Sequence, residues 1–177
     1  MMKKMVFIAL LAGCISSAGG VLTPMTRIEY VVAETESGRR QYTYTVANTG
    51  LWKDGEPAAI TEFTIWFDDG LYRNLVVATP SPLSSQWDEI VWQPEPVLGD
   101  FGAYDVMTLP SHLGIGIGQS VYGFSVSFDW LGAGQPGAQF YEIINPATFE
   151  TIAAGWTVPE PCTLLLLGVS GMMMRKR

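Results

Sequence analysis

Short segments in which large side chains alternate with small polar ones, cut apart by Gly, Pro and Asp, constrain the fold of this chain more than any other feature. The clearest is QYTYTVAN, residues 41–48, where tyrosine and valine alternate with threonine. A period of two places alternate side chains on opposite faces of a strand. The chain also holds 19 Gly and 11 Pro, residues that disfavour helices. We therefore expect short strands joined by turns, with no convincing helix between the two ends of the chain.

About eight strands are predicted between residues 26 and 152. The first two, 27–34 and 41–48, form a hairpin whose turn is centred on Ser37-Gly38. The others are expected at 60–67, 73–79, 87–92 (followed by a loop through Gly102), 121–130, 139–144 and 149–153. In the segment 121–130 the alternation places Tyr122 on the same face as Phe124. An antiparallel two-sheet β-sandwich, immunoglobulin-like or jelly-roll-like, would bury one face of each strand.

The charges are segregated along the chain. The net charge is −7, but residues 19–157 hold five basic residues against sixteen acidic ones, a difference of −11. A domain this acidic repels phosphate backbones, so nucleic-acid binding is disfavoured.

Few residues of the central domain suit catalysis. Both cysteines, Cys14 and Cys162, lie in terminal hydrophobic segments, which leaves the domain without a disulfide framework, a thiolate zinc site or a cysteine nucleophile. His112 is the single histidine and lies in the turn-like stretch LPSHLG, so we expect it to be exposed or to cap a turn. We predict that the protein is not an enzyme and needs no cofactor.

The acidic residues give little information about chemistry. Sixteen acids make carboxylate pairs inevitable, so a glycosidase-like pair among Asp68, Asp69, Asp88, Glu89 and Asp129 is only a third hypothesis, that of a hydrolase. Asp68, Asp69 and Asp129 are the candidates for calcium, but their spacing does not match an EF-hand loop. Solvated turn residues are the favoured interpretation, and no metal site is predicted.

Gly114, Gly116 and Gly118 resemble a phosphate-binding loop at first sight. A dinucleotide fingerprint requires a helix after the glycines, whereas a strand pattern follows here. We interpret them as a flexible approach to that strand.

Tryptophans offer a better candidate for binding. Trp66, Trp87, Trp92 and Trp130 lie in or beside predicted strands and would stack on sugar rings if they face outward. Packing in the core is the alternative explanation for each.

The N-terminal segment is typical of a secretory signal peptide, predicted at residues 1–18. Two lysines precede an apolar run and then small residues. Cleavage after Ala18 by signal peptidase is favoured over the alternative, in which LAGC, residues 11–14, acts as a lipobox and Cys14 is lipidated.

The C-terminal segment combines three features. Residues 162–174 are thirteen residues without a charge, which as a helix would span about 20 Å, less than the roughly 30 Å of a bilayer core. The basic residues Arg175, Lys176 and Arg177 would hold that end in the cytoplasm, with Trp156 near the interface. Pro159 and Pro161 favour an extended segment before the helix.

Taken in order, Val158-Pro159-Glu160-Pro161, a short hydrophobic helix and the basic end resemble the PEP-CTERM sorting signal of Gram-negative bacteria. The resemblance covers about the last twenty residues and departs from the usual pattern at Cys162, where a small residue such as Ala is common. It implies recognition and cleavage by an exosortase, a membrane-embedded cysteine protease, and association with the cell surface or the exopolysaccharide matrix. An ordinary membrane anchor is the alternative. The tract VYGFSVSFDWLGAGQPGAQFYEI, residues 121–143, also resembles a hairpin found in PEP-CTERM proteins.

The sequence thus predicts a signal peptide (1–18), an extracytoplasmic sandwich (22–156) and a sorting signal (157–177). The expected function is that of a non-catalytic surface or matrix protein, tethered to the inner membrane until it is processed. Its expected partners are signal peptidase, exosortase and, before processing, the membrane. The alternative function is a carbohydrate-binding module that acts in exopolysaccharide.

Overall fold

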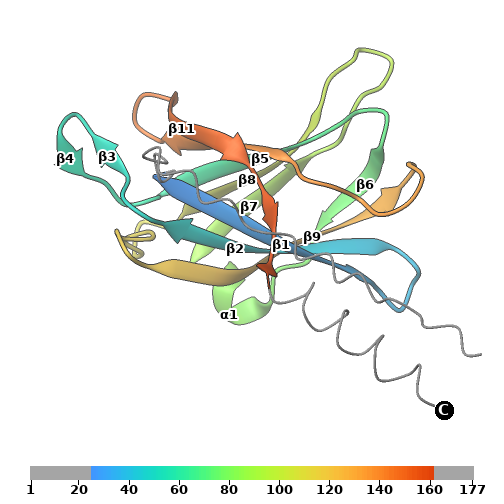
Figure 1. Ribbon diagram of the computed structural model, residues 1–177, viewed down its shortest axis with the longest axis horizontal. Coiled ribbons are helices and arrows are strands. Elements are labelled where there is room, and N and C mark those ends of the chain that lie inside the picture. Colours follow the sequence, from blue (N-terminus) through green and yellow to red (C-terminus); the bar gives the residue numbers. More distant parts are fainter. Residues whose placement is uncertain (1–24, 162–177) are drawn as a thin grey trace, which may run out of the picture.

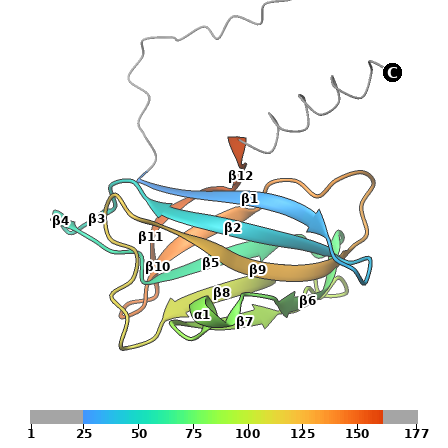
Figure 2. The same ribbon diagram turned by 90° about the horizontal axis from the view of Figure 1, so that it is seen from below.

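Two sheets of five strands pack face to face in the computed structural model, which describes residues 25–161 (Figure 1). The first sheet has the order β12 (Val158–Pro159), β1 (Thr26–Glu34), β2 (Arg40–Asn48), β9 (Ser120–Trp130), β6 (Tyr72–Val77). The second has the order β11 (Glu150–Trp156), β10 (Phe140–Asn145), β5 (Glu62–Phe67), β8 (Gly102–Thr108), β7 (Trp87–Trp92). Every neighbouring pair is antiparallel except β1 with β12. The predicted all-β sandwich is confirmed (Figure 2).

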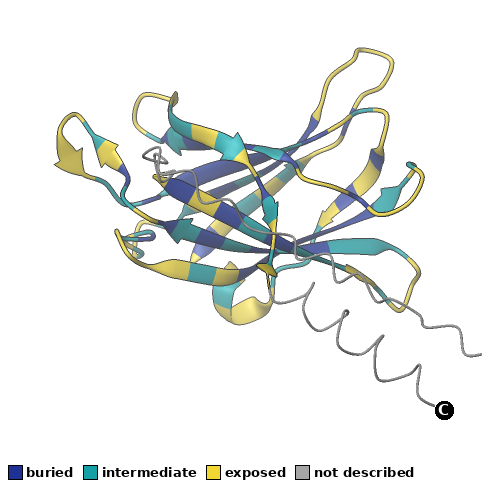
Figure 3. Ribbon diagram, in the orientation of Figure 1, coloured by how far each residue is buried: buried dark blue, intermediate teal, exposed yellow. Residues whose placement is uncertain are grey.

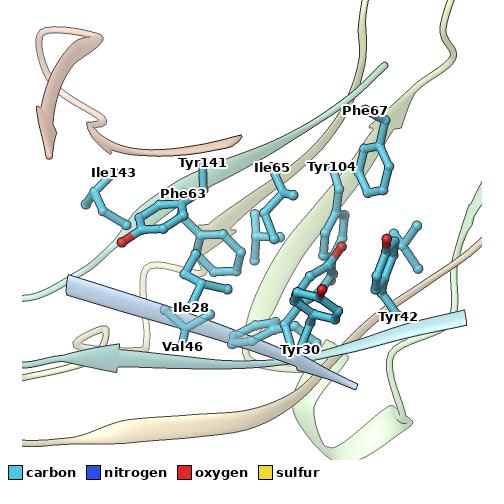
Figure 4. Packing of buried hydrophobic residues seen from close by; sticks show 14 of the residues in the cluster. Ile28, Tyr30, Tyr42, Val46, Phe63, Ile65, Phe67, Tyr104, Tyr141 and Ile143 are labelled. Carbon is cyan, nitrogen blue, oxygen red and sulfur yellow. The ribbon is translucent and has the colours of Figure 1, made fainter. Parts of the chain in front are cut away.

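The inner faces of the two sheets form one aromatic-rich core (Figures 3 and 4). Tyr42 of the first sheet stacks on Phe128 of the same sheet, with ring centroids 4.9 Å apart. Phe63 of the second sheet meets Phe124 of the first edge to face at 5.0 Å. Full burial of one such side chain contributes about 1.5–3 kcal/mol, so the alternating pattern of the strands is what holds the two layers together.

Most of the predicted strands occur within a few residues of their expected bounds. The hairpin of β1 and β2 is present, and Gly38 occupies the left-handed region at φ 80° in its turn. β5, β6, β7, β9, β10 and β11 correspond to the other predicted strands.

One central strand, β8, was not predicted. The segment after Gly102 lies between β5 and β7 and pairs with both. A Cβ atom at Gly102 would lie 2.7 Å from the Pro94 side chain. That glycine therefore permits close packing at the start of a strand, where the sequence suggested a continuing loop.

The predicted orientation of Tyr122 is wrong. Tyr44 pairs with Phe124 but the next residue, Thr45, pairs with Tyr122, so Gly123 is an extra residue in β9. This bulge reverses the alternation, and Tyr122 is exposed while Phe124 is buried. Gly123 has φ 115°, which a glycine adopts without strain.

Four short elements were also not predicted: β3 (Trp52–Lys53), β4 (Glu56–Pro57), β12 and the single helical turn α1 (Ser81–Ser84). Within residues 25–161 no helix is long and apolar enough to cross a bilayer. The predicted signal peptide, Cys14, Cys162, the apolar segment 162–174 and Arg175, Lys176 and Arg177 lie outside the described residues.

Candidate functional site

A groove of about 300 Å³ opens at the end of the sandwich where β5 turns into β6 and where the loop 131–139 leads into β10. Both sheets contribute to it. Its walls are mainly aromatic: Trp66, Phe67, Tyr72, Phe101, Trp130, Phe140 and Trp156. A concave, largely apolar site with a few polar groups is the usual form of a ligand-binding site.

The second sheet aligns three of these side chains, Trp66, Phe140 and Trp156, in one row across its outer face, and Trp92 continues that row. Trp156 pairs with Phe140, and Trp66 and Trp92 both pair with Ala103. Residues directly opposite one another in antiparallel strands project to the same face. The row crosses all five strands, or about 19 Å at roughly 4.8 Å per strand.

Neighbouring groups hold the groove tryptophans in place. Trp66 donates its indole N–H to Glu142 Oε2 over 2.9 Å, and Trp130 donates its own to the Gly134 carbonyl over 3.1 Å. Trp130 also lies edge to face on Tyr72, with centroids 5.0 Å apart. Trp156 packs in the same way on Phe140, at 5.7 Å. The aromatic walls are therefore largely preformed.

The floor of the groove is polar and buried. Tyr72 and Gln139 line it, and both are almost fully buried. The Gln139 amide nitrogen donates to the hydroxyls of Tyr42 and Tyr72 and to the Gly137 carbonyl. Burial raises the pKa of Tyr42 and Tyr72, so both phenols keep their protons. The floor is thus a neutral, fully hydrogen-bonded network.

The four tryptophans predicted as sugar-stacking candidates lie in three different environments. Trp66 and Trp130 line the groove together. Trp92 is 62% exposed and continues the row on the second sheet, outside the groove lining. Trp87 is only 2% exposed and packs against Phe63 and Phe124 in the core, so a sugar cannot reach it.

Several groove residues could not be recognised as possible binding residues from the sequence alone. Phe101 lies in a loop and Gln139 precedes β10, and only the fold brings them beside Trp66. Trp156, expected near a membrane interface, lines the groove. The predicted strand 149–153 ended three residues before Trp156, so it gave no indication of this role.

Two of the three calcium candidates, Asp68 and Asp129, serve as structural residues, and Asp69 is half-buried beside Asp68. Asp68 caps its turn by accepting a hydrogen bond from the Gly70 N–H over 2.8 Å. Asp129 bonds to Asn74 at 2.6 Å and pairs with Arg39 at 3.1 Å, and these contacts lower the pKa of Asp129. No cluster of three or more His, Cys, Asp or Glu side chains able to hold a metal occurs within residues 25–161.

His112 and the nearby glycines have local roles. The Nδ1 atom of His112 accepts the Gly114 N–H over 3.2 Å, and its ring lies 5.5 Å from that of Trp87. It caps a turn, as expected. Gly114 has φ 78°, and a Cβ there would lie 2.4 Å from the Ile60 carbonyl oxygen, because the loop bridges to Ile60 through Ile115.

The first three motif residues at the C-terminal end of the described chain, Val158, Pro159 and Glu160, lie against the first sheet. Val158 and Pro159 form β12 beside Glu29 and Tyr30 of β1. The Glu160 N–H donates to the Tyr30 carbonyl over 3.0 Å, and Thr45 donates its hydroxyl proton to Glu160 Oε1 over 2.9 Å. Pro161 is exposed. The segment is extended, as its prolines predict, but it is paired with the domain.

Comparisons with known proteins bear on the fold. No family model and no curated protein matches this sequence. An uncharacterised protein from Nocardia farcinica, described as having an immunoglobulin-like fold, superposes with a TM-score of 0.51 at 18% identity, over 72% of this chain and 82% of that one. A chain from a type I cohesin–dockerin complex of Clostridium thermocellum gives a TM-score of 0.35 at 13% identity, over 76% of this chain and 99% of that one. At these identities the first superposition shows the fold alone, an immunoglobulin-like β-sandwich.

Proposed function

We propose that this protein is an exported, non-catalytic surface or matrix protein whose sandwich binds a polysaccharide in the groove. One observation carries the proposal: tryptophans from both sheets, held by hydrogen bonds and ring contacts, converge on one groove with a polar floor. Flat apolar rings beside hydrogen-bonding groups match the two kinds of surface that a sugar ring presents. The row on the second sheet extends beyond the groove and suits a chain of several sugars.

Trp156 provides the test, because its side chain is 65% exposed and its truncation leaves the core intact. Trp156→Ala should weaken binding to the exopolysaccharide of the host by about ten-fold or more, the equivalent of roughly 1.5 kcal/mol. The matched control is Trp52→Ala, since Trp52 is also more than half exposed but lies on the β3–β4 hairpin. Equal retention of both variants and the wild type on an affinity column would contradict the proposal.

The export and sorting part of the proposal has different support. A basic and apolar N-terminal segment precedes the domain, and the order of Val158–Pro161, the apolar segment and the basic end resembles an exosortase substrate. In this proposal signal peptidase removes residues 1–18, the C-terminal segment tethers the protein to the inner membrane, and exosortase releases it to the surface or matrix.

Intact mass spectrometry of the protein from its own host tests this route. Cells with the exosortase should yield a protein that lacks about the last twenty residues, and cells without it a protein that retains them. A tail retained in both would indicate a permanent anchor. The same spectrum separates cleavage after Ala18 from lipidation of Cys14.

A further inference from the structure

The two sheets differ in charge. The five strands of the second sheet contain no Lys or Arg. They carry six acidic residues, which are Glu62, Asp88, Glu89, Asp105, Glu142 and Glu150. Four of them, Glu62, Asp88, Asp105 and Glu142, project to the outer face that holds the aromatic row, and Glu62 is nearly buried there. This face therefore carries acidic and no basic strand residues, and its field favours a cationic ligand over an anionic one.

The basic residues of the described chain are on the other sheet or in a hairpin. Arg27 and Arg40 lie on β1 and β2, Arg73 on β6, and Lys53 on β3. Arg39 reaches Asp129 of β9. None of the five lines the groove, so nothing in the described chain is positioned there to pair with a carboxylate or sulfate on a sugar.

Two carboxylates lie at the aromatic walls. Asp68 lines the groove and is exposed. Glu142 is half-buried beside Trp66, whose N–H bonds to its Oε2, and its Oε1 accepts the Thr151 hydroxyl over 2.7 Å. An ammonium group placed near Trp66 would meet both the face of an indole ring and a nearby carboxylate.

We propose that the groove selects a polysaccharide with free amino groups, such as a polymer of glucosamine. The proposal rests on the glycan-binding function proposed above and specifies its ligand. Stacking on the tryptophans supplies contact with the sugar rings, while Asp68 and Glu142 supply the preference for the protonated amine. Acetylation of the amine removes its charge and with it this preference, and a uronate polymer is repelled by the same two side chains.

Isothermal titration of the purified protein with three oligosaccharides of equal length tests the proposal at slightly acidic pH, where the amine is protonated. The three are oligomers of glucosamine, of N-acetylglucosamine and of galacturonate. The glucosamine oligomer should bind most tightly and lose affinity as salt is added. The N-acetylglucosamine oligomer should bind more weakly with little dependence on salt, and the galacturonate oligomer should bind least.

Two conservative variants assign the preference to residues. Asp68→Asn and Glu142→Gln keep an oxygen that accepts the N–H groups of Gly70 and Trp66, so the groove keeps its shape. Each should weaken glucosamine binding about two- to five-fold, as expected for one partly exposed charge pair, and leave N-acetylglucosamine binding unchanged. Asp88→Asn is the control, because it removes the same charge from β7 four residues away from Trp92.

The possible outcomes separate the two proposals. Equal affinity for the glucosamine and N-acetylglucosamine oligomers, or preference for galacturonate, would overturn the amino-sugar inference and leave glycan binding intact. Binding of none of the three oligosaccharides, together with no retention on the exopolysaccharide of the host, would overturn both. An effect of Asp88→Asn equal to that of Asp68→Asn would show that the net charge of the domain, and not the groove, sets the preference.

Discussion

Trp87 is the first residue of β7 and Trp156 is the last residue of β11, and both strands belong to the second sheet. The two side chains nevertheless differ in burial, being 2% and 65% exposed. Trp87 is enclosed by Phe63 and Phe124 between the sheets, whereas Trp156 faces solvent at the groove. At the residue scale, burial therefore decides which tryptophan stabilises the fold and which one is available to a ligand.

Trp87→Ala should lower the free energy of unfolding by about 3–5 kcal/mol, because it removes a large buried side chain and leaves a cavity. Trp156→Ala should lower it by less than about 1 kcal/mol. Urea unfolding followed by circular dichroism measures both. Comparable losses in the two variants would contradict the assignment of Trp156 to an exposed binding surface.

Glu62 makes the stability depend on pH. Its side chain is 7% exposed and its Oε2 atom has no hydrogen-bond partner among the described residues. Burial, with the nearby Asp105, raises the pKa of Glu62 above its ordinary value of 4.5. The folded protein then binds this proton more tightly than the unfolded chain does, so the stability that this proton provides is lost as the pH rises through the folded pKa.

Glu62→Gln removes the charge without a change in shape. The variant should have a higher Tm than the wild type at neutral pH, and this advantage should shrink as the pH falls through the folded pKa of Glu62 and be lost below its ordinary value of 4.5. Thermal unfolding at a series of pH values measures the difference. A constant difference across the series would mean that Glu62 does not cause the pH dependence.

At the scale of elements, β12 is the shortest strand of the first sheet and the one that carries the sorting-like motif. Only two residues pair with β1, and Glu160 adds its own N–H bond to Tyr30 and the bond from Thr45. A strand with so few contacts opens more readily than the central strands do. Its side-chain bond to Thr45 should then contribute measurably to keeping it paired.

Thr45→Ala deletes that bond and leaves the motif itself unchanged. The Glu160 amide should exchange its hydrogen about five-fold faster, which corresponds to roughly 1 kcal/mol, as measured by hydrogen exchange with mass spectrometry. Thr43→Ala is the control, because Thr43 lies on the same face of β2 but bonds to Ser125. If the Glu160 amide exchanges equally fast in both variants, Thr45 does not hold the segment.

At the scale of the whole molecule, the chain crosses from the second sheet to the first between β11 and β12. Thr157 makes the crossing and is 1% exposed. Its N–H donates to the Gln139 carbonyl over 2.8 Å, and its hydroxyl oxygen accepts the Gln139 N–H over 2.9 Å. The crossing therefore joins the two layers beside the floor of the groove.

A chain that ends at Trp156 should be less stable than one that ends at Pro161, by at least about 1 kcal/mol, because the buried Gln139 N–H loses its acceptor. Urea unfolding of the two shortened chains, each beginning at residue 25, measures the difference. Equal midpoints and slopes would show that the five residues 157–161 contribute nothing to the stability of the fold.

The sequence by itself determined the elements that depend on local pattern. Alternation and turn residues were enough for the β1–β2 hairpin and for most other strands. The same rule, applied to the alternation of Tyr104 and Val106 with Asp105, would have found β8, but the preceding Gly102 and Pro94 suggested a loop. Capping by His112 also followed from its turn-like surroundings.

Only the tertiary structure decided which face each side chain occupies and which residues meet. One extra residue at Gly123 reverses the orientation of Tyr122, and no periodicity reveals such a bulge in advance. Trp87 is buried in the core, whereas Trp66 and Trp130 line the groove, although all three lie in or at the end of similar strands. The groove itself joins residues far apart in the chain, from Trp66 to Trp156. The physical reason is that alternation in the sequence shows only which side chains share a face of one strand. The packing of the two sheets decides which face is buried and which is accessible to a ligand.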